Sequence, residues 1–264
     1  MVLLRRTYRL LKMVMLLLVG VILALLLWVP RRLGLAGDRA VLAVAGWWYR
    51  RLLGAMRAHV HVEGTIEPRA GMWISNHVSW LDIVVIGSRA PVHFVSKAEV
   101  RRWPLIGFLA AQAGTLFIRR GANESGLLAR IMENRMQQGH AILFFPEGTT
   151  GHGDYIRRFH PRLFAAAIEL NQPVTPLAVR YEHEPQPHPA VPYTNGQNMF
   201  TNLWGLLGLK RLDITLFAPP AITDLGDQRR VLADRSREVI RESLGLPAPA
   251  LPPESARIAR KSRH

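Results

Sequence analysis

An uninterrupted apolar stretch near the amino terminus places the strongest constraint on how this chain folds. Met13 to Val29 contains 17 residues without a charge, most of them Leu, Val, Ile or Met. That length is at the lower limit for a helix that crosses a bilayer. Basic residues flank the stretch on both sides, so the positive-inside rule gives no orientation. We interpret it as a membrane anchor rather than a cleaved signal peptide, because Trp28 to Arg32 is a poor cleavage site.

A second stretch, from Val41 to Val60, mixes aromatic and apolar residues with Arg50, Arg51 and Arg57. Trp and Tyr beside Arg suit the headgroup region of a membrane. An amphipathic helix packed on the folded domain fits the same pattern. Together the two stretches predict either a helical hairpin that enters the bilayer partway or one span followed by an interfacial helix.

Charge and cysteine content narrow the classes of partner and chemistry. The formal net charge is +15, which indicates nucleic acid, a membrane surface or an anionic substrate as partner. The arginines are dispersed and no nucleic-acid motif accompanies them, so we expect no nucleic-acid partner. The chain has no cysteine, which excludes disulfides, thiolate zinc sites and thiol nucleophiles.

From about residue 60 onward, short strand-like runs alternate with helical segments, which predicts an α/β fold with a largely parallel central sheet flanked by helices. The expected helices are Glu124 to Gln138, Pro161 to Leu170 and Asp227 to Leu244. The expected strands are Val60–Val62, Met72–Ser75, His93–Ser96, Thr115–Ile118, Ala141–Phe145, Val174–Arg180 and Asp213–Phe217.

The same pattern divides the chain into three parts. Residues 1–58 are expected to form a membrane anchor and an interfacial helix, and residues 59–246 a folded α/β domain. Residues 247–264 are rich in Pro and basic residues, which is typical of a flexible tail near an anionic surface.

His77 and Asp82 follow directly after the predicted strand Met72 to Ser75. On one continuous helix, residues five apart would point about 140° away from each other. Ser79 and Asp82 have the spacing of a capping box, which predicts a helix that begins after Ser79. His77 would then lie in the preceding loop and fold back onto Asp82. We predict that Asp82 fixes the imidazole tautomer and that His77 is a general base; the alternative is a structural loop histidine.

A second polar cluster, Glu147-Gly148-Thr149-Thr150, ends the predicted strand Ala141 to Phe145. Backbone N–H groups, a carboxylate and hydroxyls would therefore lie at the carboxyl edge of the sheet, where open α/β sheets bind ligands. The alternative interpretation is a plain turn shaped by Pro and Gly.

A third cluster ends the predicted strand Thr115 to Ile118 with Arg119 and Arg120. Two adjacent guanidinium groups suit a phosphate, although a solvated basic edge has the same pattern. The sequence has no P-loop, and no third or fourth ligand that would make a metal site of His77 and Asp82. With no evident nucleophile, the pattern favours direct attack by a substrate hydroxyl.

Taken together, the clusters resemble the glycerolipid acyltransferase family typified by bacterial 1-acylglycerol-3-phosphate acyltransferase. Four blocks match in order within residues 72 to 180: Asn76-His77 to Asp82, Lys97-x-Glu99 through Pro104, Gly107 and Gly114 to Arg120, Phe145-Pro146-Glu147-Gly148-Thr149, and Val174-Thr175-Pro176-Leu177.

The resemblance implies transfer of an acyl group from acyl-CoA or acyl carrier protein to a lysolipid hydroxyl, without a metal or other cofactor. It implies a bacterial-type inner membrane location with the catalytic domain facing the cytoplasm. His77 would deprotonate the hydroxyl and Asp82 would orient His77. The residues expected to bind the acceptor are Asn76, Arg120, Glu147, Gly148 and Thr149.

One position departs from the family pattern. The family's third block usually continues with an arginine that helps to hold phosphate, and this chain has Thr150 there. This is similar to the branch that acylates lyso-ornithine lipids, whose acceptor has no phosphomonoester. Arg157 or Arg158 could supply the missing charge. We expect lysophosphatidate as acceptor because Arg120 remains, with lyso-ornithine lipid as the alternative, and an inactive membrane adaptor as the alternative of another class.

Overall fold

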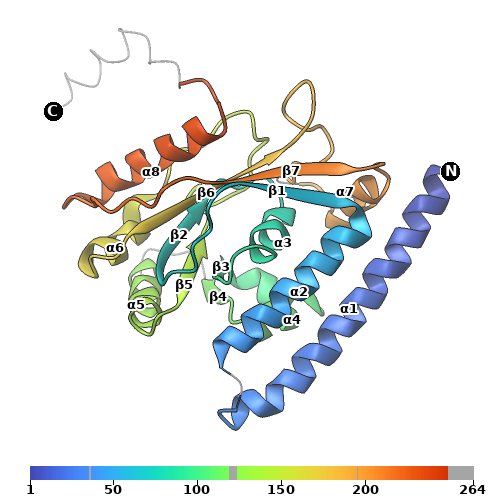
Figure 1. Ribbon diagram of the computed structural model, residues 1–264, viewed down its shortest axis with the longest axis horizontal. Helices are drawn as coiled ribbons and strands as arrows, with labels where there is room; N and C mark the ends of the chain where they lie inside the picture. Colours follow the sequence, from blue (N-terminus) through green and yellow to red (C-terminus); the bar gives the residue numbers. More distant parts are fainter. Residues whose placement is uncertain (36, 119–123, 195, 249–264) are drawn as a thin grey trace.

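The computed structural model describes residues 1–35, 37–118, 124–194 and 196–248, and it contains a seven-stranded sheet with helices on both faces (Figure 1). All seven predicted strands are present, with ends shifted by a few residues. They are β1 (Ala58–Gly64), β2 (Gly71–Ser75), β3 (His93–Lys97), β4 (Leu116–Ile118), β5 (Ala141–Phe144), β6 (Val174–Tyr181) and β7 (Leu212–Ala218).

The four helices predicted after residue 60 are also present: the one expected after Ser79 as α3, and the others as α5, as η2 with α6, and as α8. The short helices η1, α4 and α7 were not predicted, because segments of five to nine residues show too few turns to reveal a helical period. The helices are α1 (Val2–Arg32), α2 (Asp38–Met56), α3 (Leu81–Gly87), η1 (Ala98–Arg102), α4 (Ile106–Gln112), α5 (Glu124–Gln137), η2 (Pro161–Phe164), α6 (Ala165–Glu169), α7 (Met199–Leu207) and α8 (Arg229–Ser243).

The strands lie in the order β1-β7-β6-β2-β5-β3-β4. Five of the six neighbouring pairs are parallel, and β6 with β7 is antiparallel. The prediction of a largely parallel α/β sheet is therefore confirmed. Strand β2 lies between β5 and β6, and each of its five residues is buried, as expected for a parallel strand covered on both faces.

Two hydrophobic cores cover the two faces of the sheet, and β2 contributes to both. Trp73 packs into the core shared with α2 and α3, whereas Met72 and Ile74 pack into the core shared with α5, α6 and α8. The alternation follows from the two-residue period of a strand. Figure 1 shows α1, α2 and α3 on one side of the sheet and α5, α6 and α8 on the other.

Helices α1 and α2 lie side by side and are attached to the domain at several points (Figure 1). Arg9 of α1 is buried and donates to the carbonyls of Leu207 and Leu209 at the end of α7, at 3.2 and 2.6 Å. At the other end of α1, Arg31 donates to the Gln112 carbonyl of α4 at 2.9 Å. Leu52 and Leu53 of α2 are buried in the core that α2 shares with the sheet, so the second stretch is a helix packed on the domain, and its contact with a membrane interface stays a prediction.

Helix α1 is long and apolar enough to cross a membrane, and within the described residues it is the one helix that meets this test. Much of its surface is exposed: Leu18, Ile22, Leu25, Leu26 and Val29 are each about half exposed or more. The division of the chain at residue 58 remains a prediction, since α1 and α2 share a core with the sheet. Of the predicted tail at 247–264, residues 249–264 lie outside the described residues.

Candidate active site

The loop after β2 brings His77 and Asp82 together. His77 lies in the loop, and Asp82 lies in the first turn of α3. The His77 Nδ1 and the Asp82 Oδ2 are 2.8 Å apart. The Asp82 side chain is fully buried, while 18% of the His77 side chain is exposed. The geometry predicted for this pair, a loop histidine folded back onto a helical carboxylate, is the one observed.

Four donors satisfy the Asp82 carboxylate. Oδ2 accepts from the Val78 and Ser79 backbone N–H groups at 2.8 and 2.9 Å, in addition to His77. Oδ1 accepts from the Tyr181 hydroxyl at 2.6 Å. Burial, together with the negative charge of Asp82, raises the pKa of Tyr181 well above its ordinary value, so the hydroxyl stays a donor. Both oxygens of this buried carboxylate therefore have hydrogen-bond partners, as buried polar groups require.

The capping box is present in part. The Ser79 N–H donates to the Asp82 carboxylate, which is the reciprocal half of the box. The other half is weaker, because the Ser79 hydroxyl lies 3.4 Å from the Leu81 N–H and α3 begins one residue later than predicted. The half that is well formed is the one that fixes the catalytic loop against Asp82.

The imidazole of His77 is positioned by ring stacking as well as by the contact at Nδ1. Its ring stacks on Phe145 with centroids 3.9 Å apart and planes 11° from parallel. With Nδ1–H donating to Asp82, the lone pair lies on Nε2. The His77 carbonyl accepts from the Gly151 N–H at 2.8 Å, so the loop that follows β5 also fixes the His77 backbone.

Glu147 connects the loop that follows β2 with the loop that follows β5. Its Oε1 accepts from the His77 N–H at 2.8 Å, and its Oε2 accepts from the Arg157 N–H at 2.9 Å. Burial raises the pKa of Glu147, while the two N–H donors act in the opposite direction. Both oxygens therefore have backbone partners, and the contact that the structure provides for Glu147 positions the His77 loop.

The next three residues form the turn at the carboxyl end of β5. Gly148 has φ +71°, a conformation that favours glycine, and it lies against the His160 ring. Gly148 and Thr149 line the central cavity. The Thr150 hydroxyl donates to the Tyr193 carbonyl. The side chain at the position of the family's arginine thus attaches this turn to the loop before α7.

The Asn76 side chain makes its contacts with β6. Its Nδ2 donates to the Val179 carbonyl at 3.0 Å, and its Oδ1 accepts from the Val179 N–H at 2.8 Å. Asn76 is buried, and these bonds connect the start of the catalytic loop to the neighbouring strand. Its predicted contact with the acceptor stays a prediction, and the structure provides a positioning contact. Arg120, the residue expected to bind phosphate, lies outside the described residues.

A cavity of about 1670 Å³ joins this site to the amino-terminal helices. His77, Glu147 and Thr149 line it, together with apolar residues of α1 and α2 such as Leu23 and Val44. Its volume exceeds that of an ordinary drug-sized pocket, which is about 300–1,000 Å³. Four basic side chains line it as well: Arg31, Lys97, Arg162 and Arg229. Apolar walls that end at a histidine–aspartate pair can hold a long alkyl chain with its polar end at the base.

Two parts of the site were missed by the sequence. Tyr181 ends β6 and lies 99 positions from Asp82, and nothing in its local sequence marks it as a partner. Phe145 belongs to a predicted strand, but its stacking on His77 depends on the pairing of β2 with β5. Both residues lie at the carboxyl ends of the strands that flank β2. A prediction of the strand order would therefore have placed Tyr181 and Phe145 next to the His77 loop.

The arrangement agrees with comparisons to known proteins. Residues 57–180 match the protein-family description Acyltransferase. The chain is 38% identical over 213 residues to a lyso-ornithine lipid O-acyltransferase of Pseudomonas aeruginosa, which covers 81% of this chain and 82% of that protein. It is 32% identical over 177 residues to a 1-acyl-sn-glycerol-3-phosphate acyltransferase of Neisseria gonorrhoeae, covering 66% and 69%.

The fold has a solved counterpart. The crystal structure of the 1-acyl-sn-glycerophosphate acyltransferase PlsC from Thermotoga maritima matches with a TM-score of 0.67 at 17% identity, over 92% of this chain and 96% of that one. The chain belongs to the glycerolipid acyltransferase family. It is an acyltransferase enzyme of lipid biosynthesis that uses an acyl donor and a lysolipid acceptor, and it associates with membranes.

Proposed function

We propose that the protein transfers a fatty acyl group from a thioester, acyl-CoA or acyl carrier protein, to a hydroxyl of a lysolipid, with His77 as general base and Asp82 as the group that orients it. The observation that carries this proposal is the His77–Asp82 pair, held at 2.8 Å, at the wall of a large apolar cavity. No metal or other cofactor is required for this chemistry.

The reaction proceeds by direct attack. The Nε2 lone pair of His77 takes the proton of the acceptor hydroxyl, and the oxygen attacks the thioester carbonyl. The tetrahedral intermediate then expels the thiolate, which takes the proton back from the imidazolium. Asp82 stabilises that imidazolium, because its charge is fixed 2.8 Å from Nδ1.

The contacts of the remaining predicted residues separate those that position the His77 loop from those that are proposed to bind the acceptor. Glu147 and Asn76 hold the catalytic loop through backbone contacts, so we assign them positioning roles. Gly148 and Thr149 line the cavity beside His77 and are the proposed contacts for the acceptor. Arg120 is kept as a proposed acceptor contact from the family pattern alone.

We propose a lyso-ornithine lipid as the acceptor, in place of the lysophosphatidate expected from the sequence. Two observations support this choice. The hydroxyl of Thr150, where the family usually has an arginine, is engaged by the Tyr193 carbonyl. The relative from Pseudomonas aeruginosa, which bears this activity in its name, aligns with more of the chain than the one from Neisseria gonorrhoeae. An acceptor without a phosphomonoester needs no arginine at that position.

Lysophosphatidate remains the second candidate, and a specific observation favours it. Arg162 and Arg229 line the cavity and bring positive charge to it. Guanidinium groups bind phosphate well, and two of them could replace the family's arginine. A phosphate held in this way would lie within the same cavity as His77.

An acylation assay distinguishes the two acceptors. Purified protein in detergent micelles receives labelled oleoyl-CoA, or palmitoyl-acyl carrier protein, with lyso-ornithine lipid or lysophosphatidate in separate tubes. We expect an ester product at least tenfold faster with lyso-ornithine lipid. A Thr150→Arg variant should move the preference toward lysophosphatidate. Equal or greater wild-type rates with lysophosphatidate would reject the proposed acceptor and leave the acyl-transfer chemistry intact.

We also propose that α1 lies in one leaflet of the membrane rather than crossing it. Its 31 residues measure about 46 Å. Arg9 ties one end to α7 and Arg31 ties the other to α4, so a vertical crossing would break one of these contacts. The exposed leucines between them would meet lipid. Acyl-CoA and acyl carrier protein are cytoplasmic, which supports the cytoplasmic face of a bacterial inner membrane as the location.

The division of the chain stands as part of this proposal. Residues 1–58 would serve as the membrane-binding part, and residues 59–246 as the acyltransferase domain, with 247–264 as a basic tail. Removal of residues 1–58 should lower both membrane binding and the solubility of the domain, because the removed helices also cover one of its cores.

A further inference from the structure

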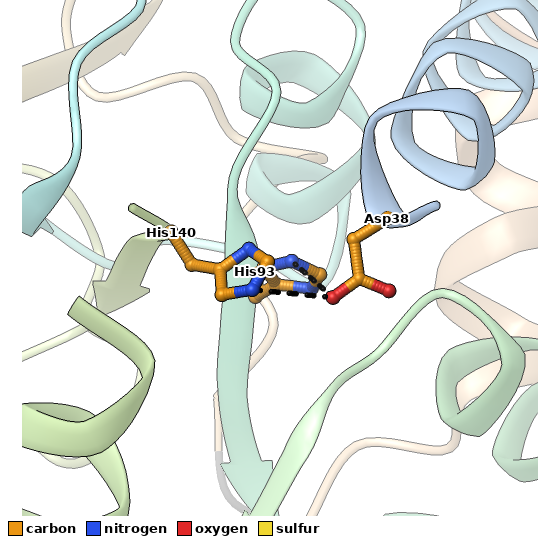
Figure 2. Close-up of side chains that lie close together, drawn as sticks. All are labelled: Asp38, His93 and His140. Atoms are coloured by element: carbon orange, nitrogen blue, oxygen red, sulfur yellow. Dashed lines mark ion pairs between the residues drawn. The ribbon is translucent and has the colours of Figure 1, made fainter. Parts of the chain in front are cut away.

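A second cluster of histidine and aspartate lies at the opposite edge of the sheet from the catalytic loops. His93 begins β3 and His140 immediately precedes β5, so both stand at the amino ends of parallel strands. Asp38 begins α2 and points toward them (Figure 2). One ligand atom from each side chain lies within 4.8 Å of the other two. The acyl-transfer mechanism uses none of these three residues.

The distances suit a tetrahedral cation. The Asp38 Oδ2 lies 3.7 Å from the His93 Nε2 and 3.5 Å from the His140 Nε2. Two ligands on one tetrahedral zinc are about 3.3 Å apart, given metal–ligand bonds of about 2.0–2.1 Å. Both distances from Asp38 therefore lie within a few tenths of an ångström of the ligand spacing in such a site, and one ligand atom from each of the three residues lies within 4.8 Å of the others.

The orientation of His93 is the second, independent observation. Its side chain is 3% exposed, and its Nε2 has no hydrogen-bond partner among the described residues. Its Nδ1 faces the Ala113 carbonyl at 3.3 Å, which is the arrangement that fixes the tautomer of metal-binding histidines. Figure 2 shows the imidazoles of His93 and His140 directed at the same carboxylate oxygen. A buried, unpartnered nitrogen lone pair is costly unless a ligand engages it.

A glycine behind His93 leaves room for this orientation. Gly114 has φ +79°, and a Cβ there would lie 2.5 Å from the His93 Nδ1. A side chain at position 114 would therefore press on the His93 ring as it is placed.

Two arginines also contact Asp38, and their positive charge lowers the affinity that we expect for a cation. Arg31 donates to the other Asp38 oxygen, Oδ1, at 2.8 Å. Arg135 lies 3.2 Å from Oδ2, and a third of its side chain is exposed, so it can turn toward solvent when a cation enters. Because two positive charges already face Asp38, we expect micromolar rather than nanomolar affinity.

We propose that Asp38, His93 and His140 form a site for a divalent transition metal, with zinc as the best match. Aspartate oxygen and two imidazole nitrogens are ordinary zinc ligands, and water would complete the coordination. The three ligands come from α2, β3 and the turn before β5. The bound metal would thus fasten the membrane-facing helix pair to the catalytic domain, far from His77.

Cobalt is the probe for the test, because Co²⁺ takes the same sites as Zn²⁺ and has visible absorption bands. The full chain in detergent, stripped with a chelator, is titrated with Co²⁺ and then with Zn²⁺. We expect a visible band that saturates at one equivalent and is abolished by Zn²⁺. We also expect Zn²⁺ to raise the Tm by a few degrees, since a ligand that binds the folded state stabilises it.

Two variants and a control make the assignment specific. The His140 side chain is 21% exposed and lies just before β5, so we expect the His140→Gln variant to fold. It should weaken Co²⁺ binding at least tenfold. His93→Gln should do the same where it folds. His183→Gln is the matched control: it removes one ring of the other close histidine pair, His183 with His188, whose centroids are 4.9 Å apart.

The outcomes separate clearly. Loss of the band in His140→Gln and its retention in His183→Gln would support the site. Equal binding by wild type and His140→Gln, or loss only in His183→Gln, would overturn it. Absence of any band with millimolar Co²⁺ would also overturn it, and would leave the cluster as an ion-pair network between Asp38 and its two arginines. None of these results depends on acyltransferase activity.

Discussion

The two histidine–aspartate clusters lie at opposite edges of one sheet and hold their histidines in different ways. At the carboxyl edge, Asp82 accepts four hydrogen bonds, one of them from His77. At the amino edge, Asp38 is shared by two arginines, and the His93 Nε2 has no hydrogen-bond partner among the described residues. The first arrangement fixes one tautomer of a base that faces a cavity, and the second leaves a buried lone pair available to a ligand.

The difference shows what surrounding donors do to a carboxylate. N–H and O–H donors that carry no charge keep the negative charge of Asp82 available to stabilise an imidazolium. Arginine partners neutralise much of the charge of Asp38 instead. The same two residue types therefore form the proposed general-base pair at one edge and the proposed metal site at the other.

The largest expected effect comes from Asp82→Asn. The amide is nearly isosteric, so its oxygen can accept from His77 while its NH₂ group meets the Tyr181 hydroxyl. The negative charge that stabilises the imidazolium is lost, and kcat should fall about 10²–10⁴-fold. Steady-state kinetics with the better acceptor measures it. Asp224→Asn, at an exposed side chain, is the control, and a kcat for Asp82→Asn within threefold of wild type would contradict the assigned role.

Tyr181→Phe should have a smaller effect on the same cluster. It removes one of four donors to Asp82 and leaves Oδ1 buried without that partner. A hydrogen bond to a charged group contributes about 1.5–3 kcal/mol, so we expect a loss of about tenfold or more in kcat. Tyr155→Phe, at an exposed tyrosine, should have none. An unchanged kcat in Tyr181→Phe would show that the three other donors hold Asp82 on their own.

Gly114→Ala tests the amino edge. A Cβ at φ +79° is strained and would press on the His93 ring, so the free energy of unfolding should fall by about 1–3 kcal/mol. The activity of the folded enzyme should stay within threefold of wild type, because His77 lies at the other edge. Gly126→Ala is the control, since nothing lies within 4 Å of its added Cβ. Chemical denaturation measures the free energy of unfolding of both variants, and steady-state kinetics measures their kcat. A loss of kcat in Gly114→Ala without a loss of stability would show that the two edges of the sheet do not act independently.

Glu147→Gln should have the smallest effect, a change in how stability depends on pH. Burial raises the pKa of Glu147 in the folded state above its ordinary 4.5, so between these two values the folded state binds more protons than the unfolded chain. The wild type therefore loses stability as the pH rises through this window, and the variant, whose amide cannot ionise, loses none from this position.

Thermal denaturation of both proteins across the window measures this effect. The Tm of the wild type relative to that of the Glu147→Gln variant should be highest at low pH, where the carboxyl is protonated in both states, and should fall as the pH rises. A Tm difference that stays constant with pH would contradict the raised pKa of Glu147.

Sequence predicted the strands, the parallel sheet and the loop in which His77 folds back to Asp82. Those features depend on local patterns: apolar runs, a capping box and clusters at strand ends. What it missed depends on contacts between distant segments. Three contacts can be predicted only when the order of the strands is known. They are the hydrogen bond from Tyr181 to Asp82, the hydrogen bond from the His77 N–H to Glu147, and the approach of His93 to Asp38.

Packing between distant segments also adds to what the sequence pattern left open. The stretch after residue 41 was open between interfacial and packed helices; burial of Leu52 and Leu53 in the sheet core shows that it packs on the domain, and its place at a membrane interface stays a prediction. The expected contact of Glu147 with the acceptor stays a prediction, and the structure adds that its oxygens accept from two backbone N–H groups, that of His77 in the loop after β2 and that of Arg157 in its own loop. Pattern alone cannot tell which partner a carboxylate will find.

The most direct test of the account is the acylation rate of His77→Ala beside wild type and His61→Ala, an exposed control in β1. All three proteins receive labelled acyl-CoA and lyso-ornithine lipid in micelles, after circular dichroism has shown that each is folded. We predict ester formation by wild type and His61→Ala, and a loss of about 10²–10⁴-fold in His77→Ala. A folded His77→Ala protein with activity within threefold of wild type would contradict the central claim that His77 is the base.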